Sequence, residues 1–208
     1  MIDLRAELSL WDGWNAGGGP KYPRDEVVRF FLRRYPSPEG RGRVRVLDLG
    51  CGGGVHTLFL AEEGFSVVAT DLSPVAVATT SRRLAGRGLD ADGVVSSFDA
   101  LPFRKASFDH VLSVGVLECA APGLAQAAVP AIATLLRPAG SGLFIFATNL
   151  DYRINDPKNA FVRQGFLETE VEAMFGDASW TVEINRHTAT EQGRTMALDE
   201  WMVTVSVP

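Results

Sequence analysis

Residues 46–54 read Val-Leu-Asp-Leu-Gly-Cys-Gly-Gly-Gly, a short apolar run that ends in a cluster of glycines. The first four residues predict a buried strand, and residues 55–63 predict a helix directly after the cluster. A strand, a glycine turn and a helix N-terminus place bare backbone against a ligand, because glycine has no side chain to obstruct it. The sequence therefore predicts a ligand-binding turn at residues 50–54.

Strands and helices alternate on either side of this turn. Further strands are expected at 66–71, 93–97, 108–114 and 142–148, and helices at 24–35, 73–87, 125–136 and 167–175. This alternation favours parallel strands, whereas the runs 180–187 and 196–207 have no helix between them and should pair antiparallel. We expect an α/β fold with a doubly wound, Rossmann-like sheet of seven strands, mostly parallel with an antiparallel C-terminal hairpin.

The length of 208 residues fits one domain spanning 1–208. Residues 1–20 look irregular, and residues 1–23 are expected to form an N-terminal arm or lid before a helix at 24–36. Two cysteines without metal-ligand spacing, no apolar leader and no window of membrane-spanning length predict a cytoplasmic protein without membrane contact.

The formal net charge of −5 gives no general reason to expect a nucleic-acid partner. One segment, residues 21–45, is nevertheless rich in Lys and Arg. It is either a solvated basic helix face or a surface for an anionic substrate.

The glycine spacing separates two kinds of nucleotide site. The dinucleotide fingerprint Gly-x-Gly-x-x-Gly fails here, because the sixth position is Val55 counted from Gly50 and Thr57 counted from Gly52. Asp71 ends the second strand, roughly 20 residues after the turn, where an acid can accept both hydroxyls of a ribose. The alternative interpretation of Asp71 is an acid at the helix N-terminus before Pro74. Asp99 follows the third strand, where it either accepts an adenine amine proton or closes an Asx turn.

These motifs resemble those of the class I S-adenosylmethionine-dependent methyltransferases over about half of the chain. Residues 48–54 resemble the family's glycine motif, 98–103 its adenine segment and 137–140 the loop before its fifth strand. The resemblance implies S-adenosylmethionine as cofactor and S-adenosylhomocysteine as product. The residues expected to bind the cofactor are Asp48, Gly50, Cys51, Gly52, Gly54, His56, Asp71, Leu72, Phe98, Asp99, Ala100 and Val114.

The resemblance also implies methyl transfer by in-line displacement to an oxygen, nitrogen, sulfur or selenium nucleophile. A small-molecule acceptor is favoured because the chain has no large inserted substrate domain. Residues 54–65 are also similar to the tellurite and thiopurine branch, which points to a soft sulfur or selenium acceptor, and a sugar or other natural-product hydroxyl is equally open. Two alternatives are an RNA or protein methyltransferase that uses residues 21–45, and a non-catalytic cofactor-binding module. We expect no metal, since no carboxylate cluster can be assembled from the sequence.

Three residues are candidates for the catalytic site. Glu118, which stands where many relatives carry a histidine, is expected to act as a base or to orient an acceptor hydroxyl or amine, or else to be a helix-start acid. Tyr22 is either a lid over the cofactor or an aromatic staple for the arm, and His187 is expected to border the acceptor. His56 either meets the cofactor carboxylate or lies on the surface, and Cys51 is expected to be structural rather than a nucleophile.

Overall fold

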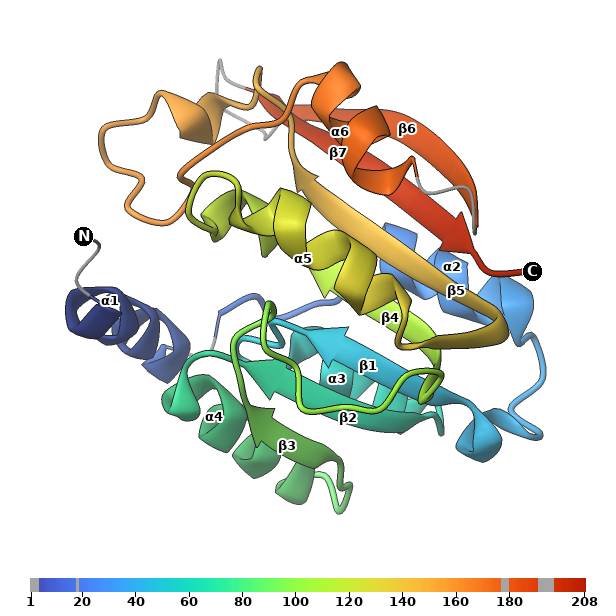
Figure 1. Ribbon diagram of the computed structural model, residues 1–208. Helices are drawn as coiled ribbons and strands as arrows, with labels where there is room; N and C mark the ends of the chain where they lie inside the picture. Colours follow the sequence, from blue (N-terminus) through green and yellow to red (C-terminus); the bar gives the residue numbers. More distant parts are fainter. Residues whose placement is uncertain (1–3, 18, 177–179, 191–196) are drawn as a thin grey trace. The chain divides into compact units, whose positions relative to one another are not determined.

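The computed structural model describes residues 4–17, 19–176, 180–190 and 197–208 (Figure 1). Contacts divide the chain into two compact units, one of residues 1–102 and 108–111, the other of residues 103–107 and 112–208. The helices are α1 (Leu4–Ala16), α2 (Asp25–Arg34), α3 (Val55–Glu62), α4 (Pro74–Ala85), α5 (Leu124–Ala133) and α6 (Glu168–Phe175), with short 3₁₀ turns η1 (Arg41–Arg43), η2 (Leu117–Cys119) and η3 (Tyr152–Ile154). The strands are β1 (Arg45–Leu49), β2 (Ser66–Asp71), β3 (Asp92–Val95), β4 (Phe108–Val114), β5 (Leu136–Ala147), β6 (Thr181–Thr190) and β7 (Ala197–Ser206).

The strands form one sheet in the order β3-β2-β1-β4-β5-β7-β6. β1 pairs parallel with β2, and β2 with β3, whereas β7 pairs antiparallel with both β5 and β6. The predicted α/β fold is therefore confirmed, with seven strands, mostly parallel, and an antiparallel C-terminal pair.

In the first unit, α3 and α4 both pack against β2 (Figure 1). The apolar residues of β1 and β2 are almost fully buried, which explains why these strands read as continuous apolar runs. α2 joins this core through Phe30 and Phe31, whose rings meet edge to face and both contact the ring of His110. The hydroxyl of Tyr35 shares a hydrogen bond of 2.8 Å with Nε2 of His110, so the end of α2 is tied to β4.

Residues 4–16 form the helix α1, and the prediction that residues 1–20 are irregular is wrong for this segment. Leu8, Trp11 and Asn15 recur at helical spacing, and Asn15 is only 1% exposed. α1 packs on α4, and the Ser73 hydroxyl donates a 2.5 Å hydrogen bond to Oδ1 of Asp12. The misreading came from Gly13 and the glycines after Ala16, which lower helix propensity but are outweighed by this tertiary packing.

In the second unit, α5 and α6 contact each other, and the rings of Phe144, Phe146, Phe166 and Phe175 pack in an apolar cluster. β5 begins at Leu136, six residues earlier than predicted. Its early part is held by the C-terminus, since Val207 N–H donates to Gly140 O at 2.9 Å. Among the helices that the structure describes, none has the length and apolarity to cross a membrane.

Candidate functional site

The glycine turn after β1 needs its alternating glycines for conformational and steric reasons. Gly50, Gly52 and Gly54 have φ values of +71°, +53° and +80°, in the left-handed region that side chains disfavour. A Cβ on Gly54 would lie 2.5 Å from Oγ1 of Thr80, so a side chain there would also collide with α4. The turn is held by α4, because Thr80 Oγ1 donates to Gly52 O at 3.0 Å and Arg83 Nη1 to Gly53 O at 2.6 Å.

Asp71 lies at the carboxyl end of β2, directly beside this turn. Its Oδ2 accepts the Gly52 N–H and its Oδ1 accepts the Ser73 N–H, both at 2.9 Å. An ionised carboxylate has about four acceptor positions, so these backbone contacts do not use its full capacity. Burial raises the pKa of Asp71 above its ordinary value, and the nearby Asp12 carboxylate adds to the rise. Leu72 follows immediately and is half-buried.

Asp48 and Cys51 are both buried within the first unit. Thr57 donates from its hydroxyl to Asp48 Oδ2 at 2.5 Å, which fastens the end of β1 to α3. Burial raises the pKa of Asp48 to about 6, and the Asp71 carboxylate contributes to the rise. Burial also raises the pKa of the Cys51 thiol, so this side chain stays protonated, in keeping with a structural role.

His56 and Tyr22 lie where α3 meets the segment before α2. Nε2 of His56 accepts the Arg24 N–H at 3.4 Å, and burial lowers the pKa of His56 to about 4, so the ring is neutral. Tyr22 is 82% exposed and lines a hollow of about 370 Å³ together with apolar residues of α3, Arg83 of α4 and Arg87 just after α4. Tyr22 in this structure is thus a surface residue of that hollow.

The segment after β3 forms a tight turn. Ala100 N–H donates to Ser97 O at 3.1 Å, and the Ser97 hydroxyl donates to the carboxylate of Asp99. Phe98 is half-buried, whereas Asp99 and Ala100 are exposed. This geometry is that of a local turn, and it leaves the outer side of the Asp99 carboxylate accessible.

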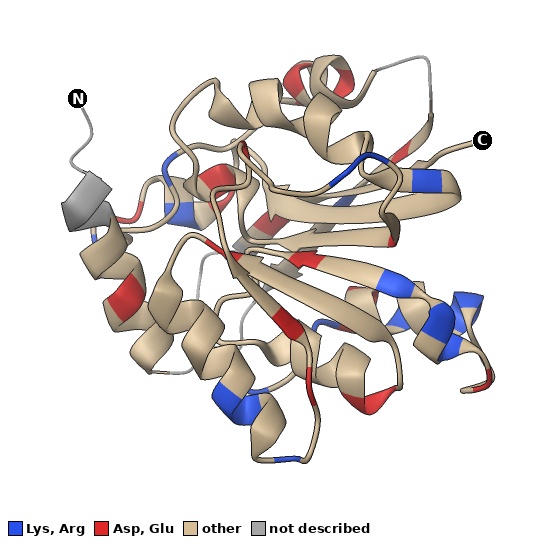
Figure 2. Ribbon diagram, turned by 60° about the horizontal axis from the view of Figure 1, so that its bottom comes forward, with Lys and Arg blue, Asp and Glu red and all other residues tan. Residues whose placement is uncertain are grey.

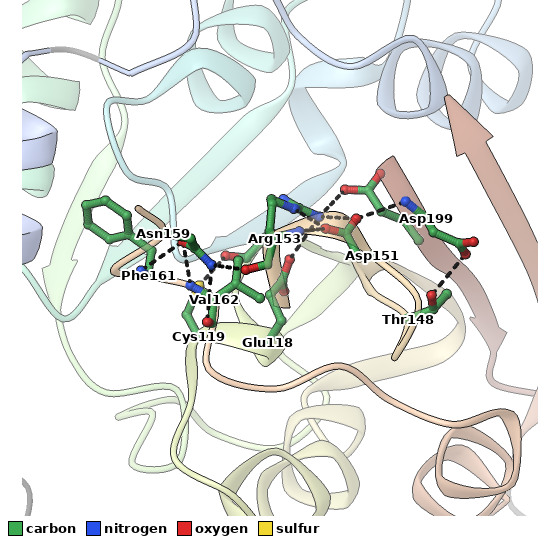
Figure 3. A network of polar contacts seen from close by, with 11 residues as sticks. Glu118, Cys119, Thr148, Asp151, Arg153, Asn159, Phe161, Val162 and Asp199 are labelled. Carbon is green, nitrogen blue, oxygen red and sulfur yellow. Dashed lines mark hydrogen bonds and ion pairs between the residues drawn. The ribbon is translucent and has the colours of Figure 1, made fainter. Parts of the chain in front are cut away.

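Glu118, in η2 of the second unit, is a fully buried acid in a charged network (Figure 3). Arg153 pairs with Asp151 at 2.8 Å and with Glu200 at 2.9 Å, and its Nη2 lies 4.0 Å from Oε1 of Glu118. In the part of the chain that the structure describes, neither carboxylate oxygen of Glu118 has a hydrogen-bond partner. Burial raises the pKa of Glu118 to about 7, although the Arg153 guanidinium opposes the rise.

The loop 149–165 is fastened over η2 through backbone contacts. Arg163 N–H and Gln164 N–H donate to Glu118 O at 2.8 and 3.2 Å, and Gln164 Nε2 donates to Ala120 O at 3.2 Å. His187 of β6 pairs in register with Glu200 of β7, so both side chains lie on one face of the sheet. Val114, the last residue of β4, is half-buried.

The sequence singles out Glu118 as a candidate, but it does not single out Arg153 or Glu200, which share its charged network. An arginine in a polar loop or an acid in a strand does not by itself indicate a functional site. Its role depends on contacts with residues that are far away in the sequence. Within the described residues, no group of three His, Cys, Asp or Glu side chains is arranged to hold a metal ion.

Residues 46–140 match the family model described as a methyltransferase domain. A ubiquinone biosynthesis O-methyltransferase of Sinorhizobium fredii is 35% identical over 97 residues, which is 47% of this chain and 39% of the relative. The enzyme of the same name from Xanthomonas axonopodis is 32% identical over 148 residues, 71% of this chain and 61% of the relative. The chain thus spans between about two fifths and three fifths of the length of these two relatives.

Among solved structures, the chain resembles a 1,6-didemethyltoxoflavin-N1-methyltransferase of Burkholderia thailandensis, determined with 1,6-didemethyltoxoflavin and S-adenosylhomocysteine bound. The TM-score is 0.65 at 22% identity, over 88% of this chain and 77% of that one, which supports the same fold. Since the segment matched by the family model carries the glycine turn and Asp71, and the sheet has the expected mixed order, the chain belongs to the class I S-adenosylmethionine-dependent methyltransferases.

Proposed function

We propose that this chain transfers a methyl group from S-adenosylmethionine to a nucleophile of a small-molecule acceptor. The observation that carries the proposal is the carboxylate of Asp71, which Gly52 and Ser73 hold in place beside a turn of left-handed glycines. The remaining acceptor capacity of this carboxylate suits the vicinal hydroxyls of a ribose.

The glycine turn beside Asp71 fits such a cofactor, because it presents backbone without side chains. The residues proposed to hold it are Asp48, Gly50, Cys51, Gly52, Gly54, His56, Asp71, Leu72, Phe98, Asp99, Ala100 and Val114. When bound, the cofactor supplies a methyl group on a sulfonium, which is already a good leaving group. The main tasks of the chain are therefore to bind the cofactor, to align the acceptor with its methyl group and to exclude water. Its side chains have little covalent chemistry to perform.

For the acceptor we place a hydroxyl oxygen first, with nitrogen and sulfur as the other nucleophiles. The support is the name of the two relatives described above, both O-methyltransferases. An alcohol or phenol must lose a proton as its oxygen is methylated. We propose Glu118 as the group that takes this proton, because a carboxylate with a pKa of about 7 is well matched to proton transfer at neutral pH.

Tyr22 and His187 complete the proposed acceptor-side residues, with no metal taking part. We further propose that residues 1–208 act as one methyltransferase domain in the cytoplasm. The support is that Cys51 and Cys119 are both thiols rather than halves of a disulfide, which suits a reducing compartment.

The cofactor assignment is tested by replacing Asp71. Asp71→Ala should weaken the binding of S-adenosylhomocysteine at least tenfold, measured by isothermal titration calorimetry, because the ribose loses its acceptor. Asp92→Ala is the matched control, since Asp92 is exposed on β3 and its loss changes the net charge equally. Equal affinities of the wild-type protein and Asp71→Ala would show that the ribose is bound elsewhere.

The transfer itself is tested with cofactor carrying a labelled methyl group and an extract of small metabolites. Transfer of label to a small molecule is expected. Binding of the cofactor at micromolar concentration without transfer to any small molecule would contradict the proposal and favour the non-catalytic module.

A further inference from the structure

Helix α1 lies against the elements that hold the glycine turn. It packs on α4, and Asp12 accepts the hydrogen bond from Ser73, the residue that caps α4 and also donates its N–H to Asp71. One helical turn further on, Oδ1 of Asn15 lies 3.4 Å from the position that a Cβ on Gly52 would occupy. The carboxamide of Asn15 therefore faces the turn itself.

Asn15 is an unusual residue for its position. It occupies the same stripe of α1 as Leu8 and Trp11 and is 1% exposed, where packing alone would favour an apolar side chain. Its Oδ1 is buried and accepts no hydrogen bond from any residue that the structure describes. Buried polar atoms in native proteins are almost always paired, so an acceptor left open beside a ligand-binding turn points to a donor on the ligand.

The neighbouring acceptors already have donors. Asp71 accepts two backbone N–H groups, and Asp48 accepts the Thr57 hydroxyl. The carbonyl oxygens of Gly52 and Gly53 accept from Thr80 and Arg83. Asn15 Oδ1, by contrast, is a buried side-chain oxygen beside the turn for which the described residues supply no donor.

The charges around the turn favour a cationic donor. The Asp12 carboxylate lies close enough to raise the pKa of Asp71, and the Asp71 carboxylate in turn raises the pKa of Asp48. The three carboxylates therefore make the electrostatic potential at the turn negative. A neutral amide can accept a hydrogen bond here without adding a fourth negative charge.

We propose that α1 is a cover for the cofactor site and that Oδ1 of Asn15 accepts a hydrogen bond from the α-ammonium group at the amino-acid end of the cofactor. This inference rests on the proposed function, since it requires that the cofactor lie against the glycine turn. The cover of the cofactor would then be α1 rather than Tyr22, whose side chain is exposed in this structure.

The test compares two ligands that share the nucleoside and differ in the amino-acid end, S-adenosylhomocysteine and 5′-methylthioadenosine. Their affinities are measured by isothermal titration calorimetry for the wild-type protein, Asn15→Leu and Asn15→Asp. Asn15→Leu should weaken S-adenosylhomocysteine about tenfold or more and change 5′-methylthioadenosine less than twofold, because only the former carries the ammonium group. Asn15→Asp should retain the affinity for S-adenosylhomocysteine, because a carboxylate also accepts from an ammonium group.

Which of the two variants binds S-adenosylhomocysteine more tightly distinguishes a binding role of Asn15 from a packing role. If Asn15 served only to pack α1, Leu would be tolerated and the buried charge of Asp would be harmful, which is the reverse order and would overturn the inference. Equal weakening of both ligands by Asn15→Leu, or no weakening, would overturn it as well. Ser9→Ala, an exposed position of the same helix, is the control and should leave both affinities unchanged.

Failure of the inference differs from failure of the proposed function. If the wild-type protein binds neither ligand, the cofactor assignment itself is wrong and the inference falls with it. If the wild-type protein binds both ligands and the Asn15 variants behave alike, only the role of Asn15 is wrong.

Discussion

Glu118 is a buried acid beside one cation and two further carboxylates. Arg153 is shared by Asp151, Glu200 and, at 4.0 Å, Glu118, so the network holds more negative than positive groups when all are ionised. Ionising Glu118 therefore adds a charge that is poorly solvated and only partly compensated. The protonated form is favoured in the folded protein, and this has a measurable consequence.

Glu118→Gln should change how stability depends on pH. The pKa of Glu118 is about 7 in the folded protein against an ordinary value of 4.5, so the folded state binds more protons between these values. The free energy of unfolding then falls as pH rises through this window, by about 2–3 kcal/mol for this group. Glutamine carries no charge at either pH, so Glu118→Gln should gain stability relative to the wild-type protein at pH 8 compared with pH 5.

Urea unfolding at both pH values measures this difference. Glu172→Gln, an exposed position of α6, is the control and should leave the pH profile unchanged. Profiles of the wild-type protein and Glu118→Gln that run parallel would show that Glu118 is already ionised at pH 5.

Residues differ in how far the sequence alone could predict them. The glycines at 50, 52 and 54 could be predicted because the backbone they require is local. The positions of Asn15 and Arg153 could not be predicted in this way. Their contacts are with residues that are distant in the sequence and come close only in the folded chain. The roles of Asp71 and Glu118 in binding and catalysis stay predictions.

At the scale of elements, Arg41 joins the end of α2 to the end of α3. It is 5% exposed, and its guanidinium donates to Tyr35 O at 2.8 Å, to Ser37 O at 3.1 Å and to Glu63 O at 3.1 Å. It also forms an ion pair with the Glu63 carboxylate. One side chain thus satisfies the backbone of two separate turns.

Arg41→Lys should destabilise the protein by about 1–3 kcal/mol, because lysine keeps the charge but has no planar fork to reach several acceptors. Urea unfolding at pH 7 measures the loss. Arg43→Lys, an exposed position in the same 3₁₀ turn, should have almost no effect. Similar stabilities of the two variants would contradict a structural role for the Arg41 guanidinium.

Elements with a strong local pattern were predicted well, as β2 and β4 show, where predicted and observed bounds agree at Ser66–Asp71 and Phe108–Val114. α1 and the start of β5 were not. The segment Arg137 to Gly140 reads as a break, yet it continues the strand because residues near the C-terminus pair with it. Such pairing is non-local and leaves no trace in the segment's own composition.

At the scale of the whole molecule, the net charge of −5 and the basic segment 21–45 give opposite indications about a nucleic-acid partner. Figure 2 shows where the Lys and Arg residues lie along the ribbon. Several arginines of this segment already have partners within the first unit. Arg29 pairs with Asp25, Arg34 lies over the ring of Phe30, and Arg45 lies over that of Phe108.

We therefore expect no specific RNA binding. A fluorescently labelled RNA oligonucleotide should show no saturable binding below about 100 µM protein at physiological salt, which is no tighter than ordinary non-specific association. Fluorescence anisotropy at two salt concentrations measures this. Submicromolar binding that weakens steeply with salt and is lost in Arg29→Glu would instead favour the RNA methyltransferase.

The buried thiol of Cys51 has a consequence for the chemical durability of the protein. A protein that handles an alkylating reagent risks alkylating itself, and a thiolate is the most reactive side chain for that purpose. Cys51 lies within the proposed cofactor turn, but burial raises its pKa and its Sγ lies 3.7 Å from the Thr80 hydroxyl. A thiol that stays protonated is a poor nucleophile. The turn can therefore carry a cysteine without inactivating itself over many cycles.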